Sequence, residues 1–103
     1  MRFLVIAEPG TNPVPEELLP SLFAAEKQWR DRYADRLDTY AWFAAGGGTG
    51  IIDVDDAETL AEAVHSHPFS PYTKTEVRPL ADADVIASRI EAAGAAAKVG
   101  ALA

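Results

Sequence analysis

The sequence predicts an α+β domain in which two helices cover one face of a four-stranded antiparallel sheet, with one further helix at the C-terminus. Short apolar, β-branched or aromatic runs typical of strands alternate with two segments of helical periodicity. A glycine-rich connection of hairpin length separates the second and third of these runs. The resulting order, β-α-β-β-α-β, is the split β-α-β or ferredoxin-like arrangement.

The first strand and the first helix are predicted from the N-terminal third of the chain. Residues 2–7 form an apolar, partly β-branched run, which indicates a mostly buried strand. Residues 8–15 contain three prolines, a glycine and an asparagine and predict a loop. A helix is expected from about residue 15 or 16 to about residue 36, because proline and acidic residues suit a first helical turn. Pro20 either kinks that turn or delays the true start of the helix.

A β-hairpin is expected in the middle of the chain. Residues 38–45 carry several aromatic and apolar side chains and predict the second strand. Residues 46–50 (GGGTG) predict a flexible hairpin connection, and residues 51–54 predict the third strand. The GGGTG run does not resemble a phosphate-binding loop, since it lacks the Lys-Ser/Thr pair and does not precede a helix.

A second helix and a fourth strand follow. Asp55 or Asp56 is the expected N-cap of a helix that ends at about residue 65 or 66. Its buried stripe is expected to consist of Ala57, Leu60, Ala61 and Val64. Prolines within residues 67–72 prevent the helix from continuing and predict a rigid loop. Residues 73–80 alternate charged side chains with threonines and a valine, which predicts a strand at a sheet edge.

The C-terminal segment, residues 82–98, predicts one further helix, capped by Asp82. We expect it to be regular to about Ala93 and frayed beyond Gly94. The whole chain, residues 1–103, is predicted to be a single domain with its core in residues 1–80. Strands one to three offer apolar residues on both faces, so a second copy is expected to cover the open face of the sheet. We therefore predict a homodimer built like an α+β barrel, or a larger ring.

Composition excludes several classes of function. A formal net charge of −7 argues against a nucleic-acid partner. No segment approaches the ~20 apolar residues of a membrane span, and no signal peptide is recognisable. The absence of cysteine excludes disulfides, thiolate zinc sites and cysteine nucleophiles, and it fits a cytoplasmic location. With only two histidines, a multi-histidine metal site is not expected, and neither is a cofactor.

Glu26 is the strongest candidate for chemistry in the chain. It falls in the middle of the apolar arc of the first helix, among Leu18, Leu19, Leu22, Phe23, Trp29, Tyr33 and Leu37. A carboxylate at that position loses its water when the helix packs, which disfavours its charged form and suits it to proton exchange. The alternative is structural: Glu26 reaches past the helix edge to an arginine or to solvent.

Two stretches of the chain resemble muconolactone isomerase and its small relatives. They are W-F-A-A-G-G-G-T-G-I-I-D-V (residues 42–54) and P-F-S-P-Y-T-K-T-E-V (residues 68–77). In addition, Ala25-Glu26-Lys27 resembles an acidic stretch on the first helix of that family. The resemblance covers roughly residues 1–80 and implies a dimeric α+β barrel that acts on a small molecule.

One departure from the family bears on the reaction. The isomerases carry Gly-His-Tyr where this chain has residues 46–48, so Gly47 stands at the position of the histidine thought to serve the lactone chemistry. The resemblance therefore favours a relative that uses the same pocket on another substrate, such as a polyketide-like or aromatic metabolite in a biosynthetic tailoring step.

Several side chains are candidates to complete a site around Glu26. As a general base, Glu26 would move a proton between the carbons alpha and gamma to a carbonyl group. Tyr72 and Tyr40 could donate a hydrogen bond to a developing enolate oxygen, although Tyr72 could instead lock its loop onto the core. An aromatic pocket for the substrate is expected from Phe23, Trp29, Tyr33, Tyr40, Trp42 and Phe69, unless these residues form plain core.

The two histidines flank the end of the second helix. His65 and His67 lie where the helix dipole stabilises a cation, which is a structural role. Either of them could instead enter the pocket of a neighbouring subunit and replace the missing family histidine. His65 is the one we place among the catalytic candidates.

Three readings of function remain open at the level of sequence. The first is a cofactor-free isomerase or cyclase that transfers a proton on an unsaturated or aromatic carbonyl compound. The second is a cofactor-independent oxygenase of the same barrel architecture, by analogy of fold alone. The third is a non-catalytic protein that binds a small molecule or assembles.

Overall fold

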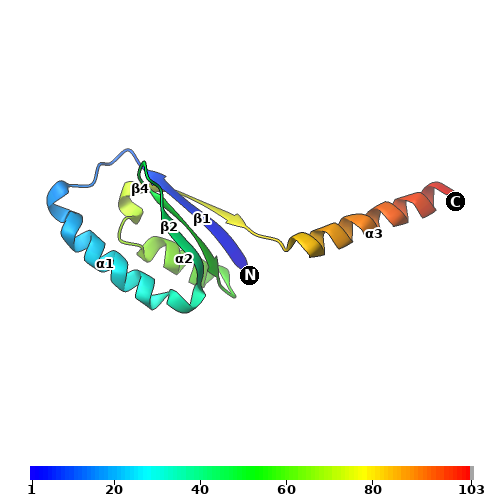
Figure 1. Cartoon of the computed structure of the whole chain (residues 1–103), viewed down its shortest axis with the longest axis horizontal. Helices are drawn as coiled ribbons and strands as arrows, with labels where there is room; N and C mark the ends of the chain where they lie inside the picture. Colours follow the sequence, from blue (N-terminus) through cyan, green and yellow to red (C-terminus); the bar gives the residue numbers. More distant parts are fainter. Residues whose placement is uncertain (103) are drawn as a thin grey trace.

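The sheet has four strands in the order β2-β3-β1-β4, and all neighbouring strands are antiparallel (Figure 1). The structure is a computed structural model that describes the backbone of residues 1–102 and the side chains of residues 1–97. Its strands and α-helices are β1 (Arg2–Pro9), α1 (Leu19–Arg32), β2 (Leu37–Trp42), β3 (Gly48–Asp53), α2 (Ala57–Ser66), β4 (Thr73–Pro79) and α3 (Ala83–Leu102). The predicted fold class and the order of elements are confirmed.

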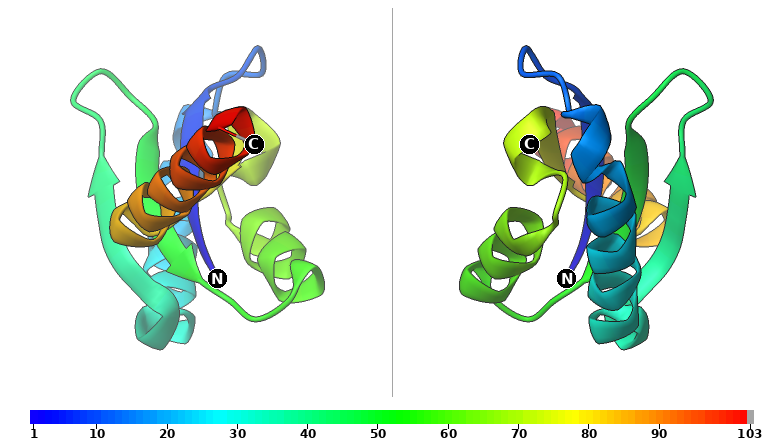
Figure 2. Two further views of the ribbon diagram at one scale, coloured as in Figure 1. Left: turned by 90° about the vertical axis from the view of Figure 1, so that its right-hand side faces the viewer. Right: turned by 90° about the vertical axis from the view of Figure 1, so that its left-hand side faces the viewer.

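Helices α1 and α2 pack on one face of the sheet (Figure 2). The core between these layers consists of Trp29, Tyr33, Ile52, Val54 and Ala63. Because side chains alternate along a strand, the partly buried Phe3 and Val5 face the helices while Leu4 and Ile6 face the other side. Within residues 1–102, which the structure describes, no helix covers the opposite face of the sheet.

The start of the first helix is delayed, which settles the role of Pro20. Residues Glu16–Leu18 form a 3₁₀ turn, and the α-helix begins at Leu19 with Pro20 in its first turn. Proline is tolerated there because its missing N–H would have no helical acceptor. The α-helix ends at Arg32, and a second 3₁₀ turn over Ala34–Arg36 leads into β2.

The hairpin differs from the prediction. The connection spans residues 43–47, where the Phe43 N–H donates to the Gly47 carbonyl at 2.9 Å, and β3 already begins at Gly48. The turn takes Gly46 and Gly47 in the left-handed region, with φ of 107° and 83°. Gly50 therefore lies within a strand. The sequence pattern was misleading because glycine is a poor strand former on its own, whereas here the pairing partners on both sides dictate the strand.

The rotation of α2 also differs from the prediction. Asp56 is the N-cap, and its carboxylate accepts the Thr59 N–H at 2.6 Å. However, Ala57 and Ala61 are exposed, whereas Ala63 is buried. The buried stripe of α2 is Leu60, Ala63 and Val64, because contact with α1 fixes the helix at Ala63.

Helix α3 extends away from the rest of the molecule (Figure 1). It gives the chain principal dimensions of 70 × 28 × 23 Å. The expectation that it ends near Ala93 is wrong, since it continues through Gly94 to Leu102. Val85, Ile86 and Ile90 are exposed on it. Over the described residues 1–102, no helix is both long enough and apolar enough to span a bilayer.

Candidate active site

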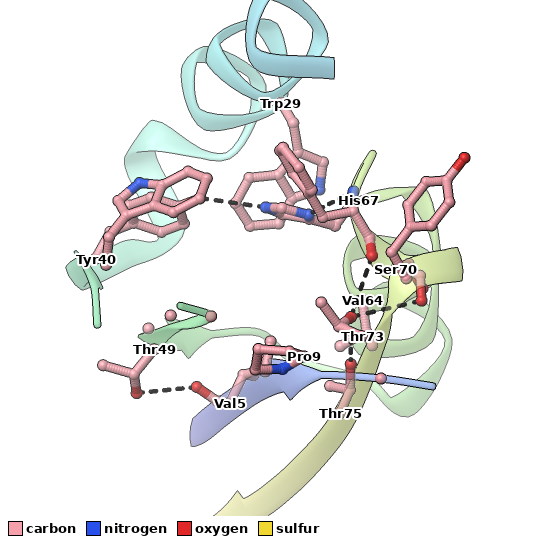
Figure 3. Close-up of a pocket in the computed structure, with 18 of the residues that line it drawn as sticks. Val5, Pro9, Trp29, Tyr40, Thr49, Val64, His67, Ser70, Thr73 and Thr75 are labelled. Carbon is pink, nitrogen blue, oxygen red and sulfur yellow. Dashed lines mark hydrogen bonds between the residues drawn. The ribbon is translucent and has the colours of Figure 1, made fainter. Parts of the chain in front are cut away.

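A cavity of about 300 Å³ lies between the helix-facing side of the sheet and the two helices (Figure 3). All four strands contribute to it, together with α1, α2, the loop after β1 and the 3₁₀ turn Ser70–Tyr72. Among its lining residues are Val5, Trp29, Tyr40, Trp42, His67, Phe69, Tyr72 and Thr75. This volume falls at the lower end of the range typical of small-molecule sites.

Glu26 is buried directly behind one wall of this cavity. The residue is only 2% exposed, and it does not line the cavity itself. The Tyr40 hydroxyl, which belongs to the lining, donates to Glu26 Oε1 at 2.7 Å. Arg30, one turn later on α1, pairs with the carboxylate through Nε at 2.6 Å from Oε1 and through Nη2 at 3.2 Å from Oε2. Glu26 thus reaches the cavity only through Tyr40.

His67 extends this arrangement on the far side of Tyr40. Its Nε2 lies 3.2 Å from the Tyr40 hydroxyl, and its Nδ1 lies 3.2 Å from the backbone N of Phe69 (Figure 3). A backbone N–H can only donate, so Nδ1 is the acceptor and neutral His67 carries its proton on Nε2. The hydrogen bonds therefore run in one direction, from His67 Nε2–H to the Tyr40 oxygen and from the Tyr40 O–H to Glu26.

The electrostatics of the site keep Tyr40 and His67 uncharged. Burial and the hydrogen bond to Glu26 raise the pKa of Tyr40, against a smaller opposing effect of Arg30. Burial lowers the pKa of His67, and the nearby Glu26 opposes that shift to a smaller extent. At neutral pH, the wall of the cavity nearest Glu26 therefore presents a neutral phenol and a neutral imidazole.

The predicted aromatic pocket is formed only in part. Trp29, Tyr40, Trp42 and Phe69 line the cavity, with Trp29 anchored by a 3.0 Å hydrogen bond from its indole N–H to the Ala63 carbonyl. Phe23 does not line the cavity and is 48% exposed, although its ring centroid is 5.5 Å from that of Trp42 and 5.4 Å from that of Phe69. Tyr33 is buried in the core instead, beside Trp29.

The two remaining catalytic candidates lie in different places. Tyr72 lines the cavity, and its part as a hydrogen-bond donor to a substrate stays a prediction. His65 is exposed and does not line the cavity of its own chain. Its expected part in catalysis is therefore not supported within one chain, and entry into the cavity of a neighbouring subunit stays a prediction.

Gly47 cannot carry the side chain that the isomerases have at this position. A Cβ built on Gly47 would lie 2.2 Å from the Ala7 carbonyl oxygen, well inside van der Waals contact, and the residue has a φ of 83°. The turn therefore packs against β1 as bare backbone. With this histidine position closed, His67 is the only histidine that reaches the cavity among the described residues.

Of the two further residues of the site, Arg30 could be expected from the sequence and His67 could not. Arg30 lies four residues after Glu26, a spacing that brings two side chains together on a helix. His67 precedes a proline at the end of α2, which turns the chain back toward the sheet. No group of three or more metal-ligating side chains occurs in the part of the chain that the structure describes.

The fold of this chain is similar to that of solved protein structures. Over 80% of this chain and 90% of the other, it superposes on muconolactone isomerase with a TM-score of 0.66 and 24% sequence identity. The chain has the fold of muconolactone isomerase. It also matches 5-chloro-2-hydroxyhydroquinone dehydrochlorinase from Burkholderia phenoliruptrix AC1100, over 82% of this chain and 97% of that one, with a TM-score of 0.68 and 13% identity.

The muconolactone isomerase fold thus hosts both an isomerase and a dehydrochlorinase among the neighbours of this chain. Comparison of the sequence with protein-family models and with curated proteins finds no match. The structural likeness accounts for the sheet and the two packed helices. The reaction depends on the cavity and on the side chains behind its wall, Glu26 and Arg30.

Proposed function

We propose that this protein is an enzyme that transfers a proton on a small carbonyl compound bound in the cavity, as an isomerase or a cyclase. The observation that carries the proposal is the hydrogen bond from the Tyr40 hydroxyl to the buried carboxylate of Glu26. This bond joins the Tyr40 hydroxyl, which can contact a substrate, to the Glu26 carboxylate, which can accept a proton. Structural neighbours with this fold are an isomerase and a dehydrochlorinase, and the latter binds 2,5-dihydroxybenzoquinone, a small conjugated carbonyl compound.

Tyr40 has one free site for a proton. A phenol has one donor and two acceptor lone pairs. Its donor is given to Glu26, and one lone pair accepts the Nε2–H of His67. The second lone pair remains for a substrate proton.

In the proposed step, the C–H bond alpha to the substrate carbonyl breaks as its proton passes to the Tyr40 oxygen. The proton that Tyr40 already carries passes at the same time to Glu26 Oε1, which leaves an enolate and a neutral Glu26. In a substrate with a double bond between its beta and gamma carbons this enolate is a dienolate, and return of the proton from Glu26 through Tyr40 to the gamma carbon completes an isomerisation without net change in the protein. Since the raised pKa of Tyr40 disfavours a free phenolate, the two transfers have to occur together.

Tyr72 is the proposed partner of the enolate oxygen. It lines the cavity, and none of the hydrogen bonds between the described side chains uses its hydroxyl. A donor aimed at a developing oxyanion typically contributes about 10²–10³-fold to a rate. Arg30 acts as a positioning residue, since its two contacts fix the orientation of the carboxylate toward Tyr40.

Exchange of carbon-bound protons tests this proposal directly. We use 2-tetralone, a ketone with acidic protons beside its carbonyl, and follow the loss of those protons in D₂O by NMR. The intact protein is expected to accelerate exchange, and Tyr40→Phe and Glu26→Gln are expected to lower the rate by about 10²–10⁴-fold. Tyr33→Phe is the matched control, because it removes the same atom from a buried tyrosine outside the cavity.

Exchange by Tyr40→Phe at the rate of the intact protein would contradict the proposal. We call the hydrogen-bonded pair Tyr40 and Glu26 the relay. Circular dichroism of each variant shows whether a lost activity reflects loss of the relay or loss of the fold. Oxygen consumption on addition of the ketone would instead point to the oxygenase reading, and we expect none.

A further inference from the structure

The lining of the cavity carries no formal charge. No aspartate, glutamate, lysine or arginine lies among its residues, all of which belong to the described part of the chain. Its polar side-chain groups are hydroxyls, one amide, the imidazole of His67 and the indole N–H groups of Trp29 and Trp42. The whole chain, moreover, has a net charge of −7, which repels anions at a distance.

The cation nearest to the relay is not available to a ligand. Arg30 does not line the cavity, and its guanidinium pairs with Glu26 and lies over the Tyr40 ring, 5.6 Å from the ring centroid. A ligand carboxylate in the cavity would therefore be buried without a cationic partner. Burial of an unpaired ion is strongly unfavourable, and a close apolar fit does not offset this loss of hydration.

His67 does not supply the missing charge. Its Nδ1 accepts the Phe69 N–H and its Nε2–H is directed to Tyr40, so both ring nitrogens are already committed in the neutral state. Burial lowers the pKa of His67 and keeps the ring neutral at pH 7. This wall thus offers a ligand one lone pair of the Tyr40 oxygen and none of the charge pairing that a carboxylate needs.

The size and walls of the cavity indicate the shape of the ligand. An engineered apolar cavity of about 150 Å³ in another protein holds one benzene ring. The present cavity, at about 300 Å³, offers room for two fused rings. Trp29, Trp42 and Phe69 provide the aromatic surfaces against which flat rings stack.

We propose that the ligand of this cavity is an uncharged, flat molecule of two fused rings with a ketone or phenol oxygen directed at the Tyr72 hydroxyl, and that carboxylated compounds are excluded. The reaction of this ligand rests on the proton transfer proposed above, but its binding does not. Gly47 belongs to the same pattern, because the turn that lines this end of the cavity is bare backbone and adds no ionisable side chain.

Calorimetric titration of the intact protein with three naphthalenes of one shape tests the charge preference. 2-Naphthol and 2-naphthamide are neutral at pH 7, whereas 2-naphthoate carries a negative charge on the same ring system. The two neutral compounds are expected to bind, and 2-naphthoate is expected to bind at least about tenfold more weakly. Binding of 2-naphthoate as tightly as 2-naphthamide would overturn the proposal, as would failure of both neutral compounds to bind.

A cation added to the cavity should reverse the preference. Thr75 lines the cavity from β4, next to Thr73. Thr75→Lys is expected to raise the affinity for 2-naphthoate about tenfold or more, with little gain for 2-naphthamide. Lys74→Thr, on the neighbouring exposed position of the same strand, is the control and should leave all three affinities unchanged.

The two proposals fail in different ways. Tyr40→Phe should keep the preference for neutral naphthalenes even though it abolishes exchange of 2-tetralone. If a variant loses the exchange of 2-tetralone but still prefers the neutral naphthalenes, only the relay is affected. A preference for the carboxylate in a protein that still exchanges 2-tetralone would overturn the assignment of the ligand and leave the relay standing.

Discussion

Among the single residues of the site, Glu26 is separated from the cavity by one side chain, that of Tyr40. Glu26 is buried, as the periodicity of its helix predicts, but its neighbours decide what it can do. Arg30 holds the carboxylate from the solvent side, and Tyr40 connects it to the cavity. The arginine alternative and the catalytic alternative for Glu26 are therefore compatible, because the same carboxylate has room for both partners.

Helical spacing made Glu26 and Arg30 accessible to prediction, whereas the partnership with Tyr40 was not. Tyr40 lies in β2, and its approach to α1 depends on the register of β2 against β3, where it pairs with Gly50. The sequence alone does not fix that register, since the strand boundary itself was misplaced by the glycines. The same reason applies to His67, whose position depends on the path of the loop after α2.

The buried imidazole of His67 predicts a specific dependence of stability on pH. Its pKa is lowered in the folded state, so the unfolded chain binds a proton that the folded chain resists below about pH 6.5. This part of the stability is present above about pH 6.5 and is lost as the pH falls toward the folded-state pKa. Urea midpoints between about pH 7 and pH 5.5 are expected to fall in the intact protein and to change less in His67→Gln.

His65→Gln is the control for this measurement. His65 is exposed at the other side of the same helix end, so its loss should leave the pH dependence of the intact protein in place. An unchanged slope in His67→Gln would show that the acid sensitivity arises elsewhere.

At the scale of elements, the hairpin between β2 and β3 is the part of the fold most constrained by single glycines. Gly47 has a φ of 83°, and a Cβ there would lie 2.2 Å from the Ala7 carbonyl oxygen. Gly47→Ala is expected to lower the free energy of unfolding by at least about 1–3 kcal/mol, because both the backbone strain and the clash have to be relieved. Chemical denaturation monitored by tryptophan fluorescence measures the change.

Gly94→Ala is the opposite case in the same chain. Gly94 lies inside α3, and nothing lies within 4 Å of a Cβ built there. Alanine is the better helix former by about 1 kcal/mol, so the variant should gain helical circular dichroism and should not lose stability. A loss of stability in Gly94→Ala comparable to that in Gly47→Ala would contradict the geometric explanation.

The existence and order of the elements were predictable because each depends on local patterns of apolar residues, proline and caps. The residues at which the strands begin and end, and the faces that the helices bury, were not predictable. Gly48 and Gly50 belong to β3 because β1 and β2 pair with them on either side. Likewise, α2 is rotated so that Ala63 rather than Ala61 is buried, because the Trp29 indole fixes it from α1. In each case a tertiary contact overrides a weak local preference.

At the scale of the whole molecule, two apolar surfaces of the single chain have no cover among the described residues. One is the outer face of the sheet, where Leu4 pairs with Ile51 in the neighbouring strand and Ile6 lies one repeat further along β1. The other is α3, where Ile90 is 65% exposed. The chain therefore has the surface that the predicted homodimer requires, and the predicted mode of pairing is sheet to sheet.

Light scattering coupled to size exclusion tests this mode of pairing. The intact protein is expected to have at least twice the 11.0 kDa mass of one chain. Ile6→Lys should lower the mass toward that of a single chain, because a lysine in the centre of a sheet-to-sheet interface would lose its contact with water on association. In the monomer the new side chain lies opposite Glu76 across the β1–β4 pairing, so the fold itself should tolerate it.

Ile90→Lys is the matched variant on α3 and separates the two surfaces. If the outer faces of the sheets form the dimer, Ile90→Lys keeps the mass of the intact protein while Ile6→Lys loses it. If instead only Ile90→Lys dissociates the assembly, the partner is held through α3, and the sheet-to-sheet arrangement is wrong. A single-chain mass for the intact protein at micromolar concentration would contradict both, and the cavity would then be complete within one chain.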